Sequence, residues 1–317
     1  MSDSKLFSLQ GDQVQELTGS VATLERNLQQ QIESNMPVFL GAQFLATEYS
    51  TGKTHRGRID SLGLDENNCP VIIEYKRSKN QNVINQGLFY LDWLLDHKAE
   101  FQWLVMEKLG KELAETIEWG GTRLICIAAD FTKYDEHAVQ QINRNIELMR
   151  YRYFGSDLLL LELVNVQSAT PASQQPTKAV AEQDGSTDSK SESKSGSKDK
   201  SQQERLAEAS PELLALYEDI CNYTMELGDE VQRKELKLYT AFKRIRNFAS
   251  VLVMPARKDP RLMIFLKLPG EMGQDDGFSR SVKDIGHWGT GDLEVTVRTA
   301  EEAEKAKELI YQSYERS

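Results

Sequence analysis

Asp60, Glu74 and Lys76 are residues of the types that can hold a divalent cation and a water molecule. They lie in two strand-like segments, GRIDSLGL and VIIEYKR, joined by the turn-forming sequence DENNCP. Side chains two apart on a strand share a face, so pairing the strands would bring Asp60 beside Glu74 and Lys76. Two carboxylates, the backbone carbonyl of Tyr75 and water suit Mg²⁺ or Mn²⁺. With a lysine beside the cation, the pattern predicts phosphodiester hydrolysis.

The same Glu-x-Lys spacing has a simpler explanation, because charged pairs two apart on a strand usually face solvent. Three features favour the metal site instead. Val71–Ile73 is an apolar run typical of a strand covered on both faces, and an ionised group after such a run is desolvated unless it is paired or bound to an ion. Asp60 lies just across the turn, and Gln86 lies on the helix that follows.

The strand–turn–strand–helix arrangement of GRID, VIIEYK and QGLFYL resembles the PD-(D/E)XK nuclease superfamily. Within it, residues 17–164 are most similar to NucS-like endonuclease domains and to a bacterial family sometimes labelled as transport proteins. The resemblance implies a restriction-endonuclease-like αβββαβ core sandwich, an α/β fold. It also implies that Asp60, Glu74 and Lys76 are the superfamily's Asp, Glu and Lys, and that Gln86 is its polar helix residue.

The superfamily's upstream acidic residue, on the first helix, best matches Glu25 in LERNLQQQIESN, with Glu33 as a competing choice. The activity implied by the resemblance is a Mg²⁺-dependent endodeoxyribonuclease that acts on DNA, in repair or in defence against foreign DNA. Related domains often form homodimers, so the resemblance also implies a homodimer. The alternative is a catalytically inactive DNA-binding or scaffold protein that keeps the nuclease fold.

Basic residues surround the predicted metal site. Arg56 and Arg58 precede Asp60, and Arg77 and Lys79 follow the second strand. Such a rim would hold phosphates and so position DNA without reading its sequence. Ordinary solvation of charged residues at strand ends explains the same pattern equally well.

A second basic stretch spans residues 233–267, which contain ten Lys or Arg and two acidic residues. Lys243, Arg244 and Arg246 are interleaved with aromatic residues there, a combination that suits a nucleic-acid surface. The alternative is a half-buried sheet with aromatic residues inside and basic residues outside. The region also resembles an uncharacterised domain found behind such nuclease domains, which implies an accessory nucleic-acid-binding role.

The elements that must position these residues alternate between helix and strand over residues 1–165, which predicts an α/β domain. Apolar residues three or four apart predict a first helix over 12–34. We expect strands at 42–50, 57–64, 71–77, 101–106, 122–129 and 157–164, and further helices at 80–97, 107–118 and 135–149.

Residues 166–205 contain six basic and six acidic residues, and from Gln167 on they contain no aromatic, Leu, Ile or Met. Such a segment buries too little apolar area to offset its ordering entropy, which predicts a disordered linker. Residues 206–317 predict a smaller α+β domain. We expect helices at 211–227, capped by Ser210, and at 300–314, with strands at 237–244, 248–255, 261–269 and 292–299.

The totals restrict the function classes. The chain has 317 residues and a net charge of −11, which argues against a protein that coats nucleic acid indiscriminately. There is no apolar run long enough to span a membrane and no signal-peptide pattern, so a transport component and membrane partners are not expected. Three widely spaced cysteines predict reduced thiols in a cytoplasmic protein.

Overall fold

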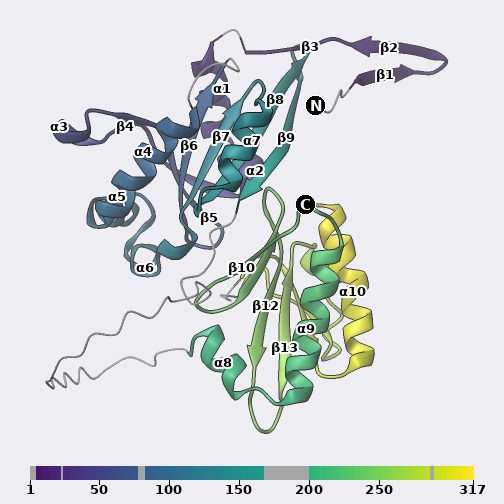
Figure 1. The fold of residues 1–317 in the computed structure, drawn as a ribbon. Coiled ribbons are helices and arrows are strands. Elements are labelled where there is room, and N and C mark those ends of the chain that lie inside the picture. The colour runs from purple at the N-terminus through teal and green to yellow at the C-terminus, as the bar shows by residue number, and fades with distance from the viewer. Residues whose placement is uncertain (1–4, 23, 78–82, 168–199, 286–288) are drawn as a thin grey trace, which may run out of the picture.

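The computed structural model describes residues 5–22, 24–77, 83–167, 200–285 and 289–317. The chain is a mixed α/β protein with two larger sheets and one projecting hairpin (Figure 1). Residues 19–167 build the first unit around one sheet, and residues 200–317 build the second unit around another. The expected α/β class is therefore confirmed.

The sheet of the first unit has strands in the order β3-β8-β7-β6-β5-β4 among the described residues, with β9 also paired to β8. Strands β4, β5 and β6 form an antiparallel meander, and β7 and β8 continue parallel to β6. The strands are β3 Gly19–Ser20, β4 Ala42–Ser50, β5 Arg58–Asp65, β6 Pro70–Lys76, β7 Arg123–Ala128, β8 Asn145–Phe154 and β9 Leu158–Gln167.

Helices cover both faces of this sheet, as its central strands require. Strands β6 and β7 are almost entirely buried and apolar, which is typical of parallel strands covered on both sides. Their even-numbered residues pack in the core beneath α4, and their odd-numbered residues pack in the core beneath α1 and α2. The helices are α1 Glu25–Ser34, α2 Met36–Leu40, α3 Gly52–His55, α4 Val83–Asp96, α5 Lys98–Leu109, α6 Lys111–Glu115 and α7 Lys133–Gln140.

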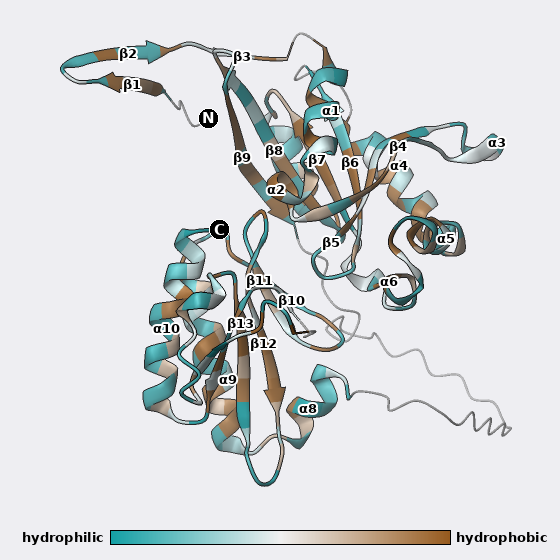
Figure 2. Cartoon of the chain, turned by 180° about the vertical axis from the view of Figure 1, so that it is seen from behind, coloured by the Kyte–Doolittle hydropathy of each residue, from teal (hydrophilic) through white to brown (hydrophobic). Residues whose placement is uncertain are grey.

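The predicted helix over 12–34 is wrong in its first half. Residues Leu6–Gln10 and Gln13–Leu17 form the strands β1 and β2 of a hairpin that projects from the body of the molecule (Figures 1 and 2). The turn between them contains Gly11 at φ +60°, a conformation that suits tight hairpins. Helix α1 begins only at Glu25. The helical spacing of apolar residues upstream of Glu25 was coincidental.

Three other predicted elements are also corrected. The segment 101–106 lies within helix α5 rather than a strand, because a short apolar run does not by itself distinguish a strand from a buried helix. The helix predicted over 135–149 ends at Gln140, and strand β8 begins at Asn145. The helix predicted over 107–118 is divided between the end of α5 and α6, with Gly110 between them.

The second unit packs two long helices, α9 and α10, against one face of its sheet (Figure 1). Its central strands are mostly hydrophobic (Figure 2). The expected cap is confirmed, since Ser210 Oγ accepts a hydrogen bond from the amide of Leu213. The elements are α8 Gln202–Glu208, α9 Pro211–Glu226, β10 Gln232–Glu235, β11 Thr240–Lys243, β12 Asn247–Met254, β13 Arg261–Leu266, β14 Ser279–Ser281, β15 Leu293–Val297 and α10 Ala300–Glu315.

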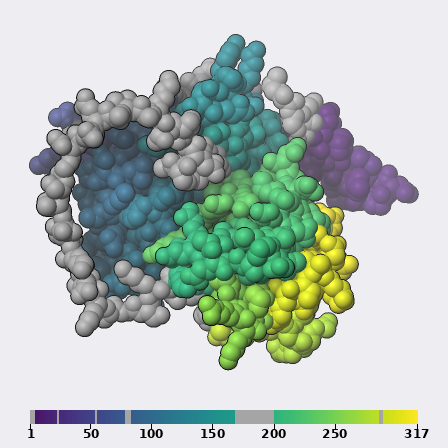
Figure 3. All heavy atoms as spheres, turned by 60° about the horizontal axis from the view of Figure 1, so that its bottom comes forward, coloured from purple at the N-terminus to yellow at the C-terminus, as the bar shows by residue number. Residues whose placement is uncertain are grey.

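Most of the predicted linker, residues 168–199, lies outside the described residues. At its C-terminal end the prediction is wrong, because helix α8 begins at Gln202. Ser201 and Glu204 form a capping box there, in which each side chain binds the other residue's backbone amide. The second unit packs directly against the first (Figure 3), through contacts described below.

Candidate metal centre

The two predicted carboxylates meet where strands β5 and β6 separate. Their regular pairing ends at Ser61 and Ile73. Beyond that point, the amide of Asp60 donates to Glu74 Oε1 at 3.2 Å, and the amide of Tyr75 donates to Asp60 Oδ2 at 3.0 Å. Each carboxylate therefore accepts a hydrogen bond from the backbone of the opposite strand. The reciprocal bonds hold the two side chains together.

Glu74 is buried without a compensating charge in direct contact. Its side chain is inaccessible to solvent, and its Oε2 has no hydrogen-bond partner among the described residues. Burial, and then the nearby Asp60, raise the pKa of Glu74 to about 9. Burial also raises the pKa of Asp60. Two desolvated carboxylates this close favour either a shared proton or a cation between them.

Lys76 lies two residues beyond Glu74 at the end of β6 and is only partly buried. Its positive charge lowers the pKa of Asp60 and of Glu74, although not enough to overcome burial. The Tyr75 side chain belongs to the opposite core, where its hydroxyl lies within hydrogen-bond distance of Ser61 Oγ, at 3.2 Å. Only the backbone of Tyr75 therefore faces the pair of carboxylates.

Helix α1 lies along the same end of β5 and β6, and it separates the two candidates for the upstream acidic residue. Glu25 Oε2 accepts a hydrogen bond from the amide of Arg77 at 3.0 Å, and its charge raises the pKa of Asp60. Glu33 accepts hydrogen bonds from Gln29 and from the buried Ser61. Both acids therefore have hydrogen-bond partners, and Glu25 is the one of the two whose charge acts on Asp60.

Gln29, which was not among the predicted site residues, connects α1 to the site. Its amide donates to the backbone carbonyl of Asp60 at 2.8 Å and to Glu33 and Thr47. Gln29 lies one helical turn after Glu25, on the same face of α1. That spacing was the available signal, because a helix that carries Glu25 toward the metal centre must also carry Gln29 there.

An open pocket of about 520 Å³ adjoins Asp60 and is lined mostly by polar residues, whereas Glu74 and Lys76 do not line it. Asp60, Arg56, Arg58 and Gln86 all line it, as does Tyr90 from helix α4. The Tyr90 hydroxyl accepts hydrogen bonds from the amide of Arg58 at 3.2 Å and from Gln86 Nε2 at 3.4 Å. These bonds join the start of β5 to α4, so the pocket combines residues from two separate elements.

Gly57 and Glu48 also line this pocket. A Cβ atom at Gly57 would overlap the ring of Tyr90, so only glycine lets the backbone approach that ring. Glu48 was not among the predicted site residues, and it forms an ion pair with Arg58 at 2.8 Å. The predicted phosphate contacts Arg56 and Arg58 are thus at the pocket, and Lys79 lies outside the described residues.

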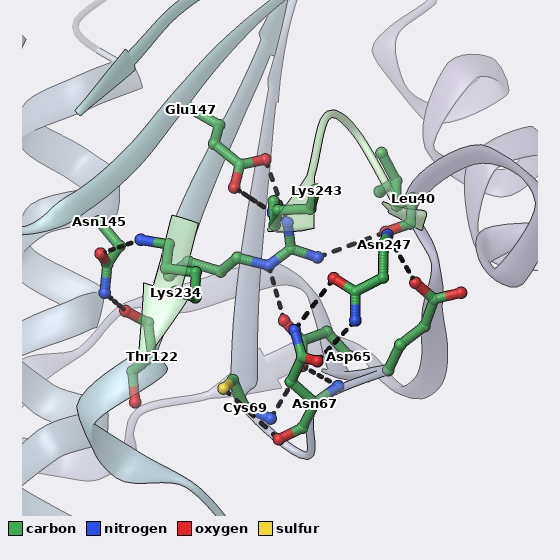
Figure 4. A network of polar contacts seen from close by, with 12 residues as sticks. Leu40, Asp65, Asn67, Cys69, Thr122, Asn145, Glu147, Lys234, Lys243 and Asn247 are labelled. Carbon is green, nitrogen blue, oxygen red and sulfur yellow. Dashed lines mark hydrogen bonds and ion pairs between the residues drawn. The ribbon is translucent and has the colours of Figure 1, made fainter. Parts of the chain in front are cut away.

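The predicted DNA contact at Lys243 is wrong. Its side chain is only 3 % exposed, and its Nζ lies 2.7 Å from Glu147 Oε1 in strand β8 of the first unit (Figure 4). Arg123 pairs with the same carboxylate and with Asp65. Lys234 donates to Asn145 across the same boundary. Lys243 and Lys234 therefore join the two units, Arg123 binds the same carboxylate from within the first unit, and these residues are not available to a phosphate backbone.

Arg244 and Arg246 also lie on a different surface from the pocket at Asp60. Arg244 pairs with Glu230 at 3.1 Å and lies over the ring of Tyr314. Both arginines line a groove of about 1050 Å³ between the second unit and strand β9. That groove is a separate surface from the polar pocket at Asp60, and the two sets of predicted DNA contacts do not form one continuous site.

The residues present fit a hard divalent cation. The centre offers two carboxylates, one with an unsatisfied buried oxygen on Glu74, and open space beside Asp60 where water can complete the coordination. Mg²⁺ binds in this way, through one or two carboxylates and several waters. A cage of three or more His, Cys, Asp or Glu side chains does not occur within the described residues. The donor set therefore suits Mg²⁺ or Mn²⁺ better than Zn²⁺.

The fold and the site together define a mixed α/β protein with a buried carboxylate pair at one end of its larger sheet. Residues 203–317 match the family described as "Domain of unknown function (DUF5655)". The chain is also 30% identical over 314 residues to a Haemophilus influenzae protein described as "Uncharacterized protein", covering 98% of this chain and 99% of the relative. The chain belongs to the same family as that protein.

No solved structure matches the chain. Within the residues that the structure describes, no helix is both long and apolar enough to cross a membrane.

Proposed function

We propose that the protein is a metal-dependent endodeoxyribonuclease of the PD-(D/E)XK type. The observation that carries the proposal is the convergence of Asp60 and Glu74 through reciprocal backbone hydrogen bonds, with Glu74 Oε2 left buried and unsatisfied. A folded protein tolerates such a pair when its function requires it, because burial of two like charges opposes folding. The adjoining polar pocket has room for a phosphate group.

The order of elements supports a restriction-endonuclease-like core in the first unit. Helix α1 is followed by the meander β4-β5-β6, then by α4 and by β7 parallel to β6. This is the αβββαβ order that the resemblance implies. The candidate residues lie on three of its elements, with Glu25 on α1, Asp60 on β5 and Glu74 and Lys76 on β6.

Each residue has a role that its position supports. Asp60 and Glu74 would hold the cation, with the Tyr75 carbonyl as an additional ligand. The cation would make a water molecule more acidic and neutralise charge that develops on the phosphate. Lys76, partly exposed beside the pair, would position that water and balance negative charge.

The pocket residues would orient the DNA. Gln86 lies in the pocket with its amide near Tyr90, where it can donate to a backbone phosphate or sugar. Arg56 is exposed at the pocket rim and would contact a neighbouring phosphate. Arg58 is already paired with Glu48, so its contribution depends on how a phosphate competes with that carboxylate.

A cleavage assay with single-residue variants tests the proposal. Wild-type protein is incubated with Mg²⁺ or Mn²⁺ and with single-stranded, branched, mismatched and duplex DNA. We expect cleavage of at least one DNA form, and a loss of at least about hundredfold in Asp60→Asn, Glu74→Gln and Lys76→Ala. The matched controls are Glu112→Gln and Lys108→Ala, which alter exposed charges on α6 and α5 and should cut normally.

Cleavage that persists in all three site variants would contradict the proposal, because a contaminating nuclease or another site would then be responsible. A wild-type protein that binds DNA but leaves every form intact with either cation would instead support the alternative, a catalytically inactive scaffold.

A further inference from the structure

A chain of aromatic rings runs along helix α4 and ends beside the polar pocket. The rings of Trp93 and His97 are stacked with centroids 4.6 Å apart, and His97 lies edge-on to His55 at 5.9 Å. His55 in turn contacts Phe89 at 5.2 Å, and Phe89 contacts Tyr90 at 5.8 Å. The buried Trp93 anchors one end of this chain in the core.

Phe89 is the exposed member of the chain. Its side chain is 47% exposed although it belongs to a helix whose opposite face forms the core. The residues on either side of it along the helix surface, Gln86 and Tyr90, both line the pocket that contains Asp60. Phe89 does not line the pocket itself, but its ring contacts Tyr90, which does, so an exposed aromatic ring lies next to the site where the scissile phosphate is proposed to bind.

The ring contacts of Phe89 distinguish it from an ordinary exposed apolar residue. Single exposed apolar side chains are common and need no explanation. Phe89, however, contacts the ring of His55 from α3 and the ring of Tyr90 within α4, so neighbouring rings support it from two elements. The next residue after His55 is Arg56, which lines the pocket. Aromatic and cationic groups thus lie side by side.

Nucleobases stack on exposed aromatic rings, and neighbouring cations hold the phosphates that link them. Within a duplex both faces of a base are already covered by its neighbours, so only an unpaired base can stack on a protein ring. We infer that Phe89, supported by His55, is a stacking platform for an unpaired nucleobase next to the scissile phosphate. The site then prefers DNA with single-stranded character. This inference rests on the proposed nuclease function.

Binding measurements without cleavage test the inference separately from the nuclease reaction. Wild type, Phe89→Ala, Phe89→Trp and the control Trp103→Ala are titrated in EDTA with a single-stranded oligonucleotide and with the corresponding duplex. The oligonucleotide carries 2-aminopurine, whose fluorescence falls when it stacks. Trp103 is a suitable control because it is 66% exposed on α5. Thermal denaturation checks that each variant is folded.

We expect Phe89→Ala to weaken single-stranded binding by about tenfold to hundredfold and to abolish the 2-aminopurine quenching, with duplex binding unchanged. Phe89→Trp should retain both properties, and Trp103→Ala should resemble wild type. Equal binding of both DNA forms by wild type, or an equal loss for both forms in Phe89→Ala, would overturn the inference. Neither result would affect the cleavage assay, so the nuclease proposal is judged independently.

Discussion

At the scale of single residues, Glu74 determines what the candidate site can do. Its buried, unsatisfied oxygen and its proximity to Asp60 make ionisation unfavourable unless a cation is present. Without the cation the residue opposes folding at neutral pH, and with the cation the same arrangement becomes a binding site. Such a conflict between stability and function is characteristic of active sites.

Replacing Glu74 by Gln measures this conflict through stability alone. The pKa of Glu74 is about 9 in the folded protein, against an ordinary value of 4.5. Below pH 4.5 the carboxyl is protonated in both states. As the pH rises from 4.5 toward 9, only the unfolded chain ionises, so the free energy of unfolding of wild type falls. Glutamine cannot ionise, so the variant avoids this loss.

We therefore expect Glu74→Gln to raise the Tm at pH 8 in EDTA by roughly 5 °C, with the difference shrinking toward pH 4. Thermal denaturation followed by circular dichroism across this pH range provides the measurement, and Glu112→Gln is the control. A variant that is less stable than wild type at pH 8 would show that Glu74 is not strained.

At the scale of elements, the site depends on how helix α4 meets the start of strand β5. The Tyr90 hydroxyl accepts hydrogen bonds from the amide of Arg58 and from Gln86, and Gly57 allows the strand to approach the ring. The Tyr90 hydroxyl thus sets the distance between Asp60, which is proposed to hold the cation, and Gln86, which is proposed to orient DNA.

Removing that hydroxyl should loosen this junction while the core stays intact. We expect Tyr90→Phe to reduce the cleavage rate by about tenfold and to lower the free energy of unfolding by only about 1 kcal/mol. The measurements are single-turnover cleavage and urea denaturation, with Tyr134→Phe as the control because Tyr134 is 73% exposed. If activity and stability are both unchanged, Tyr90 does not position the site.

The same scale explains which elements could be predicted. Strands β5, β6 and β7 and helix α4 were predicted because each carries a clear periodic or continuous apolar pattern bounded by turn residues. Helix α5 was missed because FQWLVM suits a buried strand equally well. Only the packing of this segment against β4 and α4 determines that it is a helix. The boundary between α7 and β8 was missed because Ile142, in the turn between them, continues the helical spacing of apolar residues from Val139 to Ile146.

At the scale of the whole molecule, the two units are joined by a buried polar network and not by a chain segment alone. Glu147 binds Arg123 and Lys243, and Asn67 exchanges hydrogen bonds with Asn247 (Figure 4). Burial alone would raise the pKa of Glu147, but the two cations outweigh burial and lower it to about 2. The two units that the predicted linker connects are therefore docked against each other.

Removing one partner from this network should destabilise the protein strongly. We expect Lys243→Ala to lower the free energy of unfolding at pH 7 by about 3 kcal/mol, because it leaves Glu147 with an incompletely balanced buried charge. Lys258→Ala, which removes an exposed charge in the same unit, should have little effect. Urea denaturation measures both. Equal stability of the two variants would contradict the importance of the network.

The pH dependence of the same network follows from Glu147. Its pKa is lowered in the folded state, so its contribution is fully present above its ordinary value of 4.5 and is lost as the pH falls toward 2. In Lys243→Ala this acid-induced loss should be smaller than in wild type, since the carboxyl of Glu147 would have one cation instead of two.

The sequence alone determined the central pair of the candidate site. Asp60 and Glu74 lie on strands joined by a short turn, so local chain geometry is enough to bring them together. The roles of residues that are distant in sequence depended on tertiary packing. The hydrogen bond that Ser61 donates to Glu33 and the pairing of Lys243 with Glu147 each join separate elements, and the exposure of Phe89 also depends on how the elements pack. No local pattern specifies such contacts, because burial and partner choice are properties of the assembled fold.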